Sequence, residues 1–219
     1  VGPYPHPICN FVVDLQMVPN QIPSLVELVT ELPSIAVVHL PGDTPTNLAS
    51  LLERAGFKVN HRLVQMMRSP SREEPAVPVH SVVDSQERLE IGRFMADQFF
   101  SAQTTAFRRK LADTTATADV ELMSFKEDAD IYAAAMICDD RNTLGLYNVC
   151  VEPPRRGRGV GSCLVRQCCG HADRLRRQLT LQCSMTLTHW YAQFGFAPVG
   201  EVRIYRLSNG RQDAIMQLV

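Results

Sequence analysis

Three glycines stand at alternate positions among arginines in the stretch "PPRRGRGVGSC", residues 153–163. They are Gly157, Gly159 and Gly161. Glycine has no Cβ and reaches positive φ easily, so the backbone can curl at these positions and its amide N–H groups can converge on one anion. A helix is expected from residue 160 on, and its positive N-terminal end favours the same anion. The pattern predicts a phosphate-binding turn, and the simpler alternative is a plain connecting turn.

The spacing of the glycines separates this turn from two common phosphate-binding motifs. A P-loop places Lys and then Ser or Thr after its last glycine, and the segment "GVGSCL" has no lysine. A Rossmann fingerprint has the form Gly-x-Gly-x-x-Gly and is followed by a parallel series of strands and helices, which this sequence does not predict. What remains is Arg156-x-x-Gly159-x-Gly161, preceded by Val151-x-Pro153.

Two segments of the chain resemble the GNAT acetyltransferase superfamily. "VCVEPPRRGRGVGSCLV" is similar to that family's acetyl-CoA-binding motif, and "HWYAQFGFAPVGE" resembles its closing Tyr-x-x-x-Gly-Phe segment. The interval between Arg156 and Tyr191 suits one helix and one strand, and the resemblance extends over about residues 77–207. It implies an N-acetyltransferase that moves acetyl from acetyl-CoA to a primary amine in a ternary complex. The alternatives are a CoA-binding or sensing module without catalysis and a CoA-independent interaction protein.

The resemblance also implies which residues bind acetyl-CoA. Backbone amides of residues 158–162 are expected to hold the pyrophosphate, and the open edge of the preceding strand is expected to pair with the pantetheine arm as an added strand would. Ser184 stands where the family often has Asn, and its hydroxyl is expected to contact the same arm. The full expected set is Val149, Cys150, Val151, Arg156, Gly157, Arg158, Gly159, Val160, Gly161, Ser162, Ser184 and Tyr191.

A tyrosine in the closing segment is the expected general acid. Tyr191 occupies the position at which the resemblance implies a hydroxyl beside the thioester sulfur. A phenol with an ordinary pKa of about 10 can protonate a leaving thiolate or donate a hydrogen bond to it. The alternative is a core tyrosine that packs beside Trp190, Phe194 and Phe196.

The general base is not evident from residue types. The strand glutamate that serves as the base in histone-modifying relatives would fall near Gly145, which has no side chain. Glu121 is retained as a weak base candidate, with Tyr147, Glu152 and His189 as alternatives. His189 also fits a simple helix start, and Glu152 fits a solvated loop charge. A relay through water is a further alternative that the resemblance allows.

The stretch "MMRSPSREEPAVP", residues 66–78, divides the chain. It holds three prolines, two serines and a charge cluster between apolar runs, which is typical of a linker. We therefore predict a non-catalytic N-terminal segment over residues 1–70, a linker over 71–78 and a catalytic GNAT domain over 79–219.

The N-terminal segment alternates between predicted strands and helices. They are a strand over 11–15, a helix over 22–32, a strand over 34–40, a helix over 44–56 and a strand over 57–67. Gly56 and Phe57 match the Gly-Phe of the closing segment, but Leu52 stands where the tyrosine would be, and no glycine turn is available. The segment is interpreted as a truncated GNAT-like repeat, with an unrelated small α/β cap as the alternative.

After the linker, the pattern predicts helices, an antiparallel hairpin and a crossover that contains the glycine turn. The predicted elements are a strand over 77–83, helices over 84–100 and 103–113, a hairpin over 119–140 that turns at 127–129, a strand over 144–152, a helix over 160–176, a strand over 179–184, a short helix over 188–195 and a closing strand pair around 199–207. Asp84 is the expected N-cap of the first of these helices. The predicted fold class is α/β: a GNAT-type mixed, largely antiparallel sheet flanked by helices, with a smaller N-terminal α/β segment.

The composition is that of an ordinary globular chain, with 219 residues, 45% hydrophobic, 21% charged and a formal net charge of −1. The near-zero charge argues against a general nucleic-acid binder, although arginines cluster at residues 155–158. No run of about 18 apolar residues occurs, so no membrane helix is predicted. The expected partners are acetyl-CoA and a small-molecule or peptide amine, without nucleic acid or membrane, and homodimer formation is left open.

The seven cysteines have no spacing typical of a disulfide framework. Cys163, Cys168 and Cys169 share one predicted helix, at a spacing that does not converge on a single metal, and no metal site is expected. Reduced thiols indicate a reducing compartment, so we expect a cytoplasmic protein.

Overall fold

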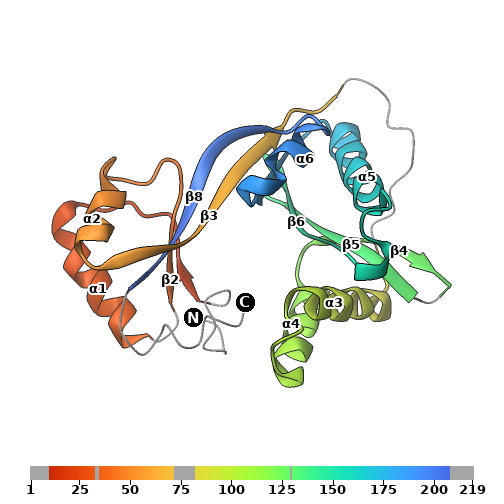
Figure 1. The fold of residues 1–219 in the computed structure, drawn as a ribbon, viewed down its shortest axis with the longest axis horizontal. Helices are drawn as coiled ribbons and strands as arrows, with labels where there is room; N and C mark the ends of the chain where they lie inside the picture. The colour runs from red at the N-terminus through yellow and green to blue at the C-terminus, as the bar shows by residue number, and fades with distance from the viewer. Residues whose placement is uncertain (1–9, 33–34, 72–81, 129, 208–219) are drawn as a thin grey trace. The chain divides into compact units, whose positions relative to one another are not determined.

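The computed structural model describes residues 10–32, 35–71, 82–128 and 130–207. Eight strands form one mixed sheet in the order β1-β2-β8-β3-β7-β6-β5-β4, and helices flank it, which confirms the predicted fold class (Figure 1). The described residues divide into two compact units. One contains the residues up to Gln65, Gln182–Thr188 and the residues from Pro198, and the other contains Met66–Leu181 and His189–Ala197. None of the described helices is long and apolar enough to cross a membrane.

The first unit builds one apolar core from two helices and its strands. Ile22, Leu25 and Val29 recur at helical spacing along α1, and all three are buried in this core. β2 pairs in parallel with β1 and antiparallel with β8. The elements are β1 Phe11–Val12, a 3₁₀ turn Pro19–Gln21, α1 Ile22–Glu31, β2 Ala36–His39, α2 Leu48–Arg54, most of β3 Phe57–Arg68, a 3₁₀ turn Met185–Leu187 and most of β8 Ala197–Leu207.

One element of this unit differs from the prediction. Ala197–Leu207 is a single strand, so the predicted closing strand pair around 199–207 is wrong. A Cβ at Gly200 would lie 2.4 Å from Cγ of Pro41, so this glycine permits a close approach of two segments inside a continuous strand.

The second unit carries α3 and α4 on one face of its strands and α5 on the other (Figure 1). Successive residues of β6 show the two faces, because Cys150 packs with Ile91 and Met95 of α3, whereas Val151 adjoins α5. The elements are α3 Ser85–Phe99, α4 Thr105–Thr117, β4 Glu121–Glu127, β5 Asp130–Asp139, β6 Thr143–Val151, a 3₁₀ turn Pro153–Arg155, α5 Val160–Leu175, most of β7 Gln178–Cys183 and most of α6 Thr188–Ala192. The predicted hairpin over 119–140 is confirmed by β4 and β5, which pair antiparallel.

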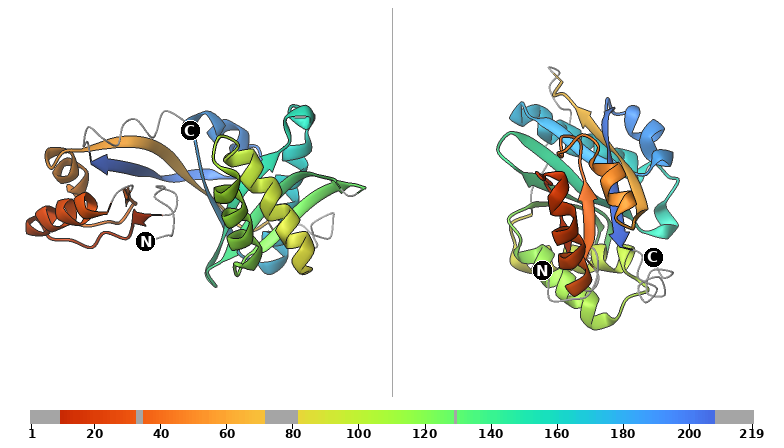
Figure 2. Two further views of the ribbon diagram at one scale, coloured as in Figure 1. Left: turned by 90° about the horizontal axis from the view of Figure 1, so that it is seen from below. Right: turned by 90° about the vertical axis from the view of Figure 1, so that its left-hand side faces the viewer.

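The helices α3 and α4 lie side by side (Figure 2). Asp84 caps α3 as predicted, since its carboxylate accepts a hydrogen bond of 2.8 Å from the amide of Glu87. Thr104 caps α4. A Cβ at Gly92 would lie 2.6 Å from the carbonyl oxygen of Ala112, so only glycine allows the two helices to approach this closely.

The strand β6 ends beside the glycine turn with one edge unpaired. Its parallel pairing with β7 ends at Gly145 and Thr180 in the register of the described strands. Its antiparallel pairing with β5 contains a bulge between Ala134 and Met136, and Asn148 on β6 has a φ of +51° there. The last residues of β6 therefore have backbone groups that β7 does not use.

Part of the predicted organisation falls outside the described residues. Residues 72–78 of the predicted linker and most of the strand predicted over 77–83 lie there, and Val82 and Val83 belong to no strand. The predicted boundaries at 1–70, 71–78 and 79–219 stay predictions.

Candidate active site

The glycine turn lies between β6 and α5. Gly157 and Gly159 have φ values of +73° and +80°, in the left-handed region that favours glycine, and Gly159 is the N-cap of α5. A Cβ at either position would meet no heavy atom within 4 Å, so both glycines face open space. Gly161 differs, because its ideal Cβ would make ordinary contacts with Val151 and Trp190. The backbone conformation therefore requires glycine at the first two positions.

The first amides of α5 have no acceptor. The amide of Cys163 donates to the carbonyl of Gly159 at 3.0 Å and closes the first helical turn. The N–H groups of Val160, Gly161 and Ser162 precede that bond and have no partner within the helix. No side chain caps this helix end, and these amides bond to no residue of the described chain. Unpaired donors at the positive end of a 16-residue helix form a site for an anion.

Arg158 is the arginine of the turn that is free to contact a ligand. Its side chain is exposed and has no ion pair or hydrogen bond within the described ranges. Arg156 instead donates from Nε to the carbonyl of Val151 at 2.8 Å and from Nη2 to Oε1 of Gln98 at 3.2 Å. These two hydrogen bonds hold the turn against the end of β6 and against α3. Arg156 therefore stabilises the conformation of the turn, and its positive charge lies next to the turn.

Arg155 belongs to a separate surface cluster. Its Nε donates to Glu152 at 2.8 Å, its guanidinium also bonds Glu127, and it lies 4.2 Å above the ring of Tyr132. Glu152 was an alternative general base, and here its carboxylate accepts from Arg155.

The end of β6 lies beyond the pairing with β7, and its Val151 carbonyl accepts a hydrogen bond from Arg156. Val149 and Val151 are half-buried and lie beyond the pairing with β7. Cys150 points to the opposite face, where its thiol is buried and lies 3.6 Å from the carbonyl of Ala134. Burial raises the pKa of Cys150 to about 12, so only its backbone can take part in binding.

Tyr191 lies in α6 as predicted and is only 8% exposed. Its ring packs edge-to-face on Trp190 and Phe196, with ring centroids 4.7 Å and 5.8 Å apart. Trp190 also adjoins Gly161 of the glycine turn, at 3.7 Å from its ideal Cβ. The structure therefore brings the two segments that carry the family resemblance together.

Arg68, which sequence reasoning missed, fixes the Tyr191 segment. Its Nε donates to the carbonyl of Phe194 at 2.9 Å, and its two terminal nitrogens donate to Asp173 at 2.7 Å and 2.8 Å. The two charged side chains are 12% and 9% exposed. Burial acts to raise the pKa of Asp173, but hydrogen bonds from Arg68 and from the amide of Ser71 outweigh it and lower this pKa below its usual range.

Glu121 lies away from the glycine turn. Its carboxylate is 3.1 Å from Nε2 of His171, on the C-terminal half of α5. The turn is at the other end of that helix, about 16 Å away along its axis from Val160 to His171. The structure therefore does not bring Glu121 to the unpaired amides of residues 160–162.

Two further base candidates are Tyr147 and His189. The ring of Tyr147 covers Gly145, since a Cβ there would lie 2.4 Å from Cε2 of the ring. Burial and the neighbouring Cys138 and Asp140 raise the pKa of Tyr147, which opposes loss of its proton. His189 is exposed on α6.

Ser184 belongs to the first unit, where it is exposed and its hydroxyl lies 2.7 Å from that of Thr186. Among the residues that the structure describes, no three His, Cys, Asp or Glu side chains gather where they could hold a metal.

The Acetyltransferase (GNAT) domain family matches residues 120–198, which contain the glycine turn and Tyr191. No curated protein sequence matches the chain significantly. A GCN5-related N-acetyltransferase from Kribbella flavida shares the fold with a TM-score of 0.68 at 14% identity, over 92% of this chain and 80% of that one. A putative GNAT acetyltransferase from Novosphingobium aromaticivorans has a TM-score of 0.59 at 17% identity, over 94% and 86% of the two chains. A tandem GNAT protein from the clavulanic acid biosynthesis pathway has a TM-score of 0.60 at 13% identity, over 82% and 66%.

The domain match and the shared fold agree with the local geometry. The matched residues hold a strand, a glycine turn with free amides and a helix, followed by an aromatic segment that adjoins the turn. Residues 120–198 therefore match a domain of the acetyltransferase (GNAT) family, and the described chain shares its fold with a GCN5-related N-acetyltransferase.

Proposed function

We propose that the chain is an N-acetyltransferase that moves acetyl from acetyl-CoA to a primary amine. The observation that carries this proposal is the run of unpaired amides over residues 160–162, at the N-terminus of α5. These residues fit a pyrophosphate because Gly157 and Gly159 leave open space beside the donors. Arg158 adds a free positive charge, and the unpaired edge of β6 offers backbone groups to the pantetheine arm.

We propose that the amine attacks acetyl-CoA directly while both are bound to the enzyme in a ternary complex. The amine nitrogen forms a bond to the thioester carbonyl carbon, the C–S bond breaks, and its electron pair stays on sulfur. The hydroxyl of Tyr191 donates a proton to that thiolate. The amine gives up its own surplus proton to water, because Glu121 is bonded to His171 at the far end of α5.

Three buried cysteines of this unit, Cys150, Cys168 and Cys169, are poor nucleophiles, which supports direct attack over an acetyl-enzyme intermediate on any of them. A thiol reacts as its thiolate. Burial raises the pKa of Cys150 to about 12 and that of Cys169 to about 11, and it also raises the pKa of Cys168. The described cysteines are free thiols, which is in keeping with a reducing, cytoplasmic setting.

The first unit is proposed to be a truncated, non-catalytic GNAT-like repeat. Gly56 precedes Phe57 with a φ of +94°, just as Gly195 precedes Phe196 with a φ of +87°. Leu52 takes the place of the tyrosine and is fully buried. Among the solved structures that share the fold is a protein described as a tandem GNAT protein.

Release of free CoA from acetyl-CoA in the presence of an amine tests the proposed activity. The panel comprises a lysine-containing peptide, a small primary amine, an aminoglycoside and a polyamine. We expect amine-dependent thiol release with at least one acceptor and acetylated amine as the product. If acetyl-CoA binds but no acceptor causes release of free CoA, the chain is a non-catalytic CoA-binding module. If acetyl-CoA does not bind, both the acetyltransferase and the CoA-binding module are contradicted.

Tyr191→Phe is expected to lower turnover by about tenfold or more, since it removes the proton donor. Its affinity for acetyl-CoA should change by less than about twofold, because phenylalanine keeps the ring packing on Trp190 and Phe196. Steady-state turnover and calorimetric titration measure the two effects. Tyr132→Phe, which alters a ring beneath Arg155, serves as the control. Unchanged turnover in Tyr191→Phe would show that Tyr191 is not the general acid.

A further inference from the structure

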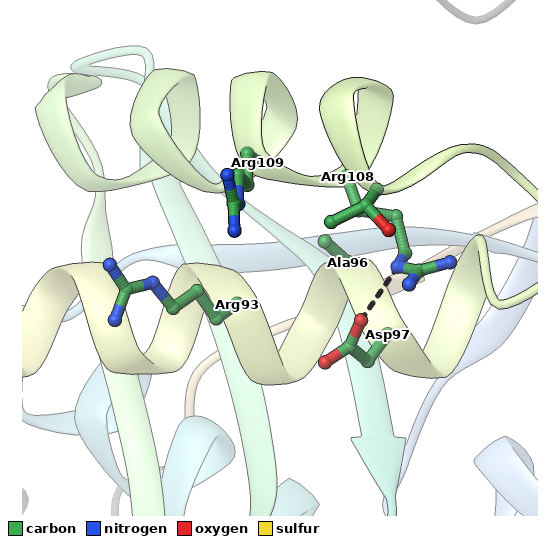
Figure 3. A pocket seen from close by; sticks show the side chains of 6 residues that line it. Arg93, Ala96, Asp97, Arg108 and Arg109 are labelled. Carbon is green, nitrogen blue, oxygen red and sulfur yellow. Dashed lines mark ion pairs between the residues drawn. The ribbon is translucent and has the colours of Figure 1, made fainter.

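A groove between α3 and α4 presents charged side chains that the acyl-transfer proposal does not use. Its volume is about 610 Å³. The α3 residues occupy the C-terminal half of that helix, and the α4 residues occupy its first turns. Three arginines face one aspartate, so the groove has a surplus of two positive charges. The lining residues are Arg93, Ala96, Asp97, Thr105, Arg108 and Arg109 (Figure 3).

Arg108 is neutralised and held in place. Its Nε forms an ion pair of 2.8 Å with Asp97. Its Nη1 donates to the carbonyls of Ser101 and Gln103 at 3.0 Å and 2.6 Å, which fixes the loop between the helices. The carboxylate of Asp97 is thereby engaged, and the surplus charge belongs to the other two arginines.

Arg93 and Arg109 have no hydrogen bond or ion pair to any residue that the structure describes. Arg93 stands four residues before Asp97 on one helix, a spacing at which opposite charges commonly pair, yet Asp97 contacts Arg108. In Figure 3 the Arg109 side chain points from α4 towards α3, and the Arg93 side chain extends along α3; both line the groove. Two like charges that share one groove repel each other, and a bound anion relieves that repulsion.

We infer that this groove binds a phosphate monoester. Its two surplus charges complement the charge of about −1.5 to −2 that a phosphate monoester carries at pH 7. Guanidinium groups match phosphate oxygens in bidentate geometry, and the Thr105 hydroxyl lines the same groove. The N-terminal end of α4 adds the positive end of its dipole. Gly92 holds the helices close together, so the arginines sit on a fixed frame.

The phosphate monoester has two chemical sources. Gln98, the residue after Asp97, bonds to Arg156 of the glycine turn, so α3 adjoins the proposed acetyl-CoA site. The 3′-phosphate of CoA is therefore one source, and a separate phosphorylated ligand is the other. The site itself does not depend on the acyl-transfer proposal.

An NMR titration with inorganic phosphate at constant ionic strength tests the groove directly. We expect saturable shifts of the Arg93 and Arg109 Nε–H signals. The double variant Arg93→Gln/Arg109→Gln should bind phosphate at least about tenfold more weakly. The control Lys58→Gln/Lys110→Gln removes the same charge from exposed positions outside the groove and should change binding by less than about twofold.

Titrations of the arginine double variant with CoA and 3′-dephospho-CoA distinguish the sources. A loss of affinity for CoA but not for dephospho-CoA assigns the groove to the CoA phosphate. Unchanged affinity for both, with weakened phosphate binding, assigns it to a separate phosphorylated ligand. Equal phosphate binding by the double variant and the unmodified chain, or equal losses in the two double variants, overturns the proposal. The phosphate titration contains no acetyl-CoA, so its failure is distinct from failure of the acyl-transfer proposal.

Discussion

Gly159→Glu is expected to weaken acetyl-CoA binding by at least about a hundredfold, or about 2.7 kcal/mol, while the chain stays folded. The new side chain would enter open space beside the unpaired amides of residues 160–162, where the pyrophosphate is proposed to lie. Its carboxylate would then compete for those donors and repel the phosphates. The φ of +80° adds strain of about 1–2 kcal/mol for any residue with a Cβ. Calorimetric titration measures the affinity, and circular dichroism checks the fold.

Gly159→Gln is the matched control for this variant. It has the same size and the same backbone strain as Gly159→Glu but carries no charge. We expect it to bind acetyl-CoA more weakly than the unmodified chain and clearly more tightly than Gly159→Glu. Micromolar binding by Gly159→Glu, or equal losses in both variants, would contradict the placement of phosphates at this turn.

Asp173→Asn is expected to lower the free energy of unfolding by about 3 kcal/mol. It removes the charge that balances the nearly buried Arg68, whose Nε also holds the carbonyl of Phe194. Urea unfolding measures the loss. Asp113→Asn, an exposed aspartate on α4, is the control and should change stability by less than about 0.5 kcal/mol. A loss in Asp173→Asn no larger than that of the control would show that the buried pair does not stabilise the fold.

The same pair predicts a pH dependence. The pKa of Asp173 is lower in the folded chain than in the unfolded chain, so its charged form stabilises the fold. That contribution is complete above the unfolded pKa of about 3.9 and is lost as pH falls through the lower, folded value. Asp173→Asn should therefore differ from the unmodified chain at neutral pH and converge with it in acid.

The glycine turn was predictable because its geometry depends on the backbone. Gly157 and Gly159 in the sequence predict positive φ, and the helix that follows them predicts unpaired amides at its start. The structure has both features. The capping of α3 by Asp84 was predictable for a similar reason, since a cap acts within one turn of chain.

The hydrogen bonds and ion pairs that hold the candidate site in place were not predictable from the sequence, because they join residues far apart in the chain. Asp173 gave a partial signal, as a charge on the apolar face of α5 requires a partner. Nothing in the sequence named that partner as Arg68, which is 105 residues away. The hydrogen bond between Arg156 and Gln98 joins residues 58 positions apart and could not be predicted from the sequence either.

The placement of the base candidates also lay beyond the sequence. Glu121 and the glycine turn fall at opposite ends of α5 because β4 pairs antiparallel with β5, and that register brings Glu121 beside His171. Glycine in a strand can mark a turn or a close approach, and at Gly200 only the neighbouring Pro41, far away in the sequence, shows that it is a close approach.

The central claim is that backbone amides at the start of α5 hold the pyrophosphate of acetyl-CoA. Parallel calorimetric titrations with acetyl-CoA and with S-acetylpantetheine, which lacks the pyrophosphate together with the 3′-phosphoadenosine attached to it, test it most directly. We predict that acetyl-CoA binds one molecule per chain and at least about a hundredfold more tightly than S-acetylpantetheine. Equal affinity for the two ligands, or no binding of acetyl-CoA, would contradict the claim.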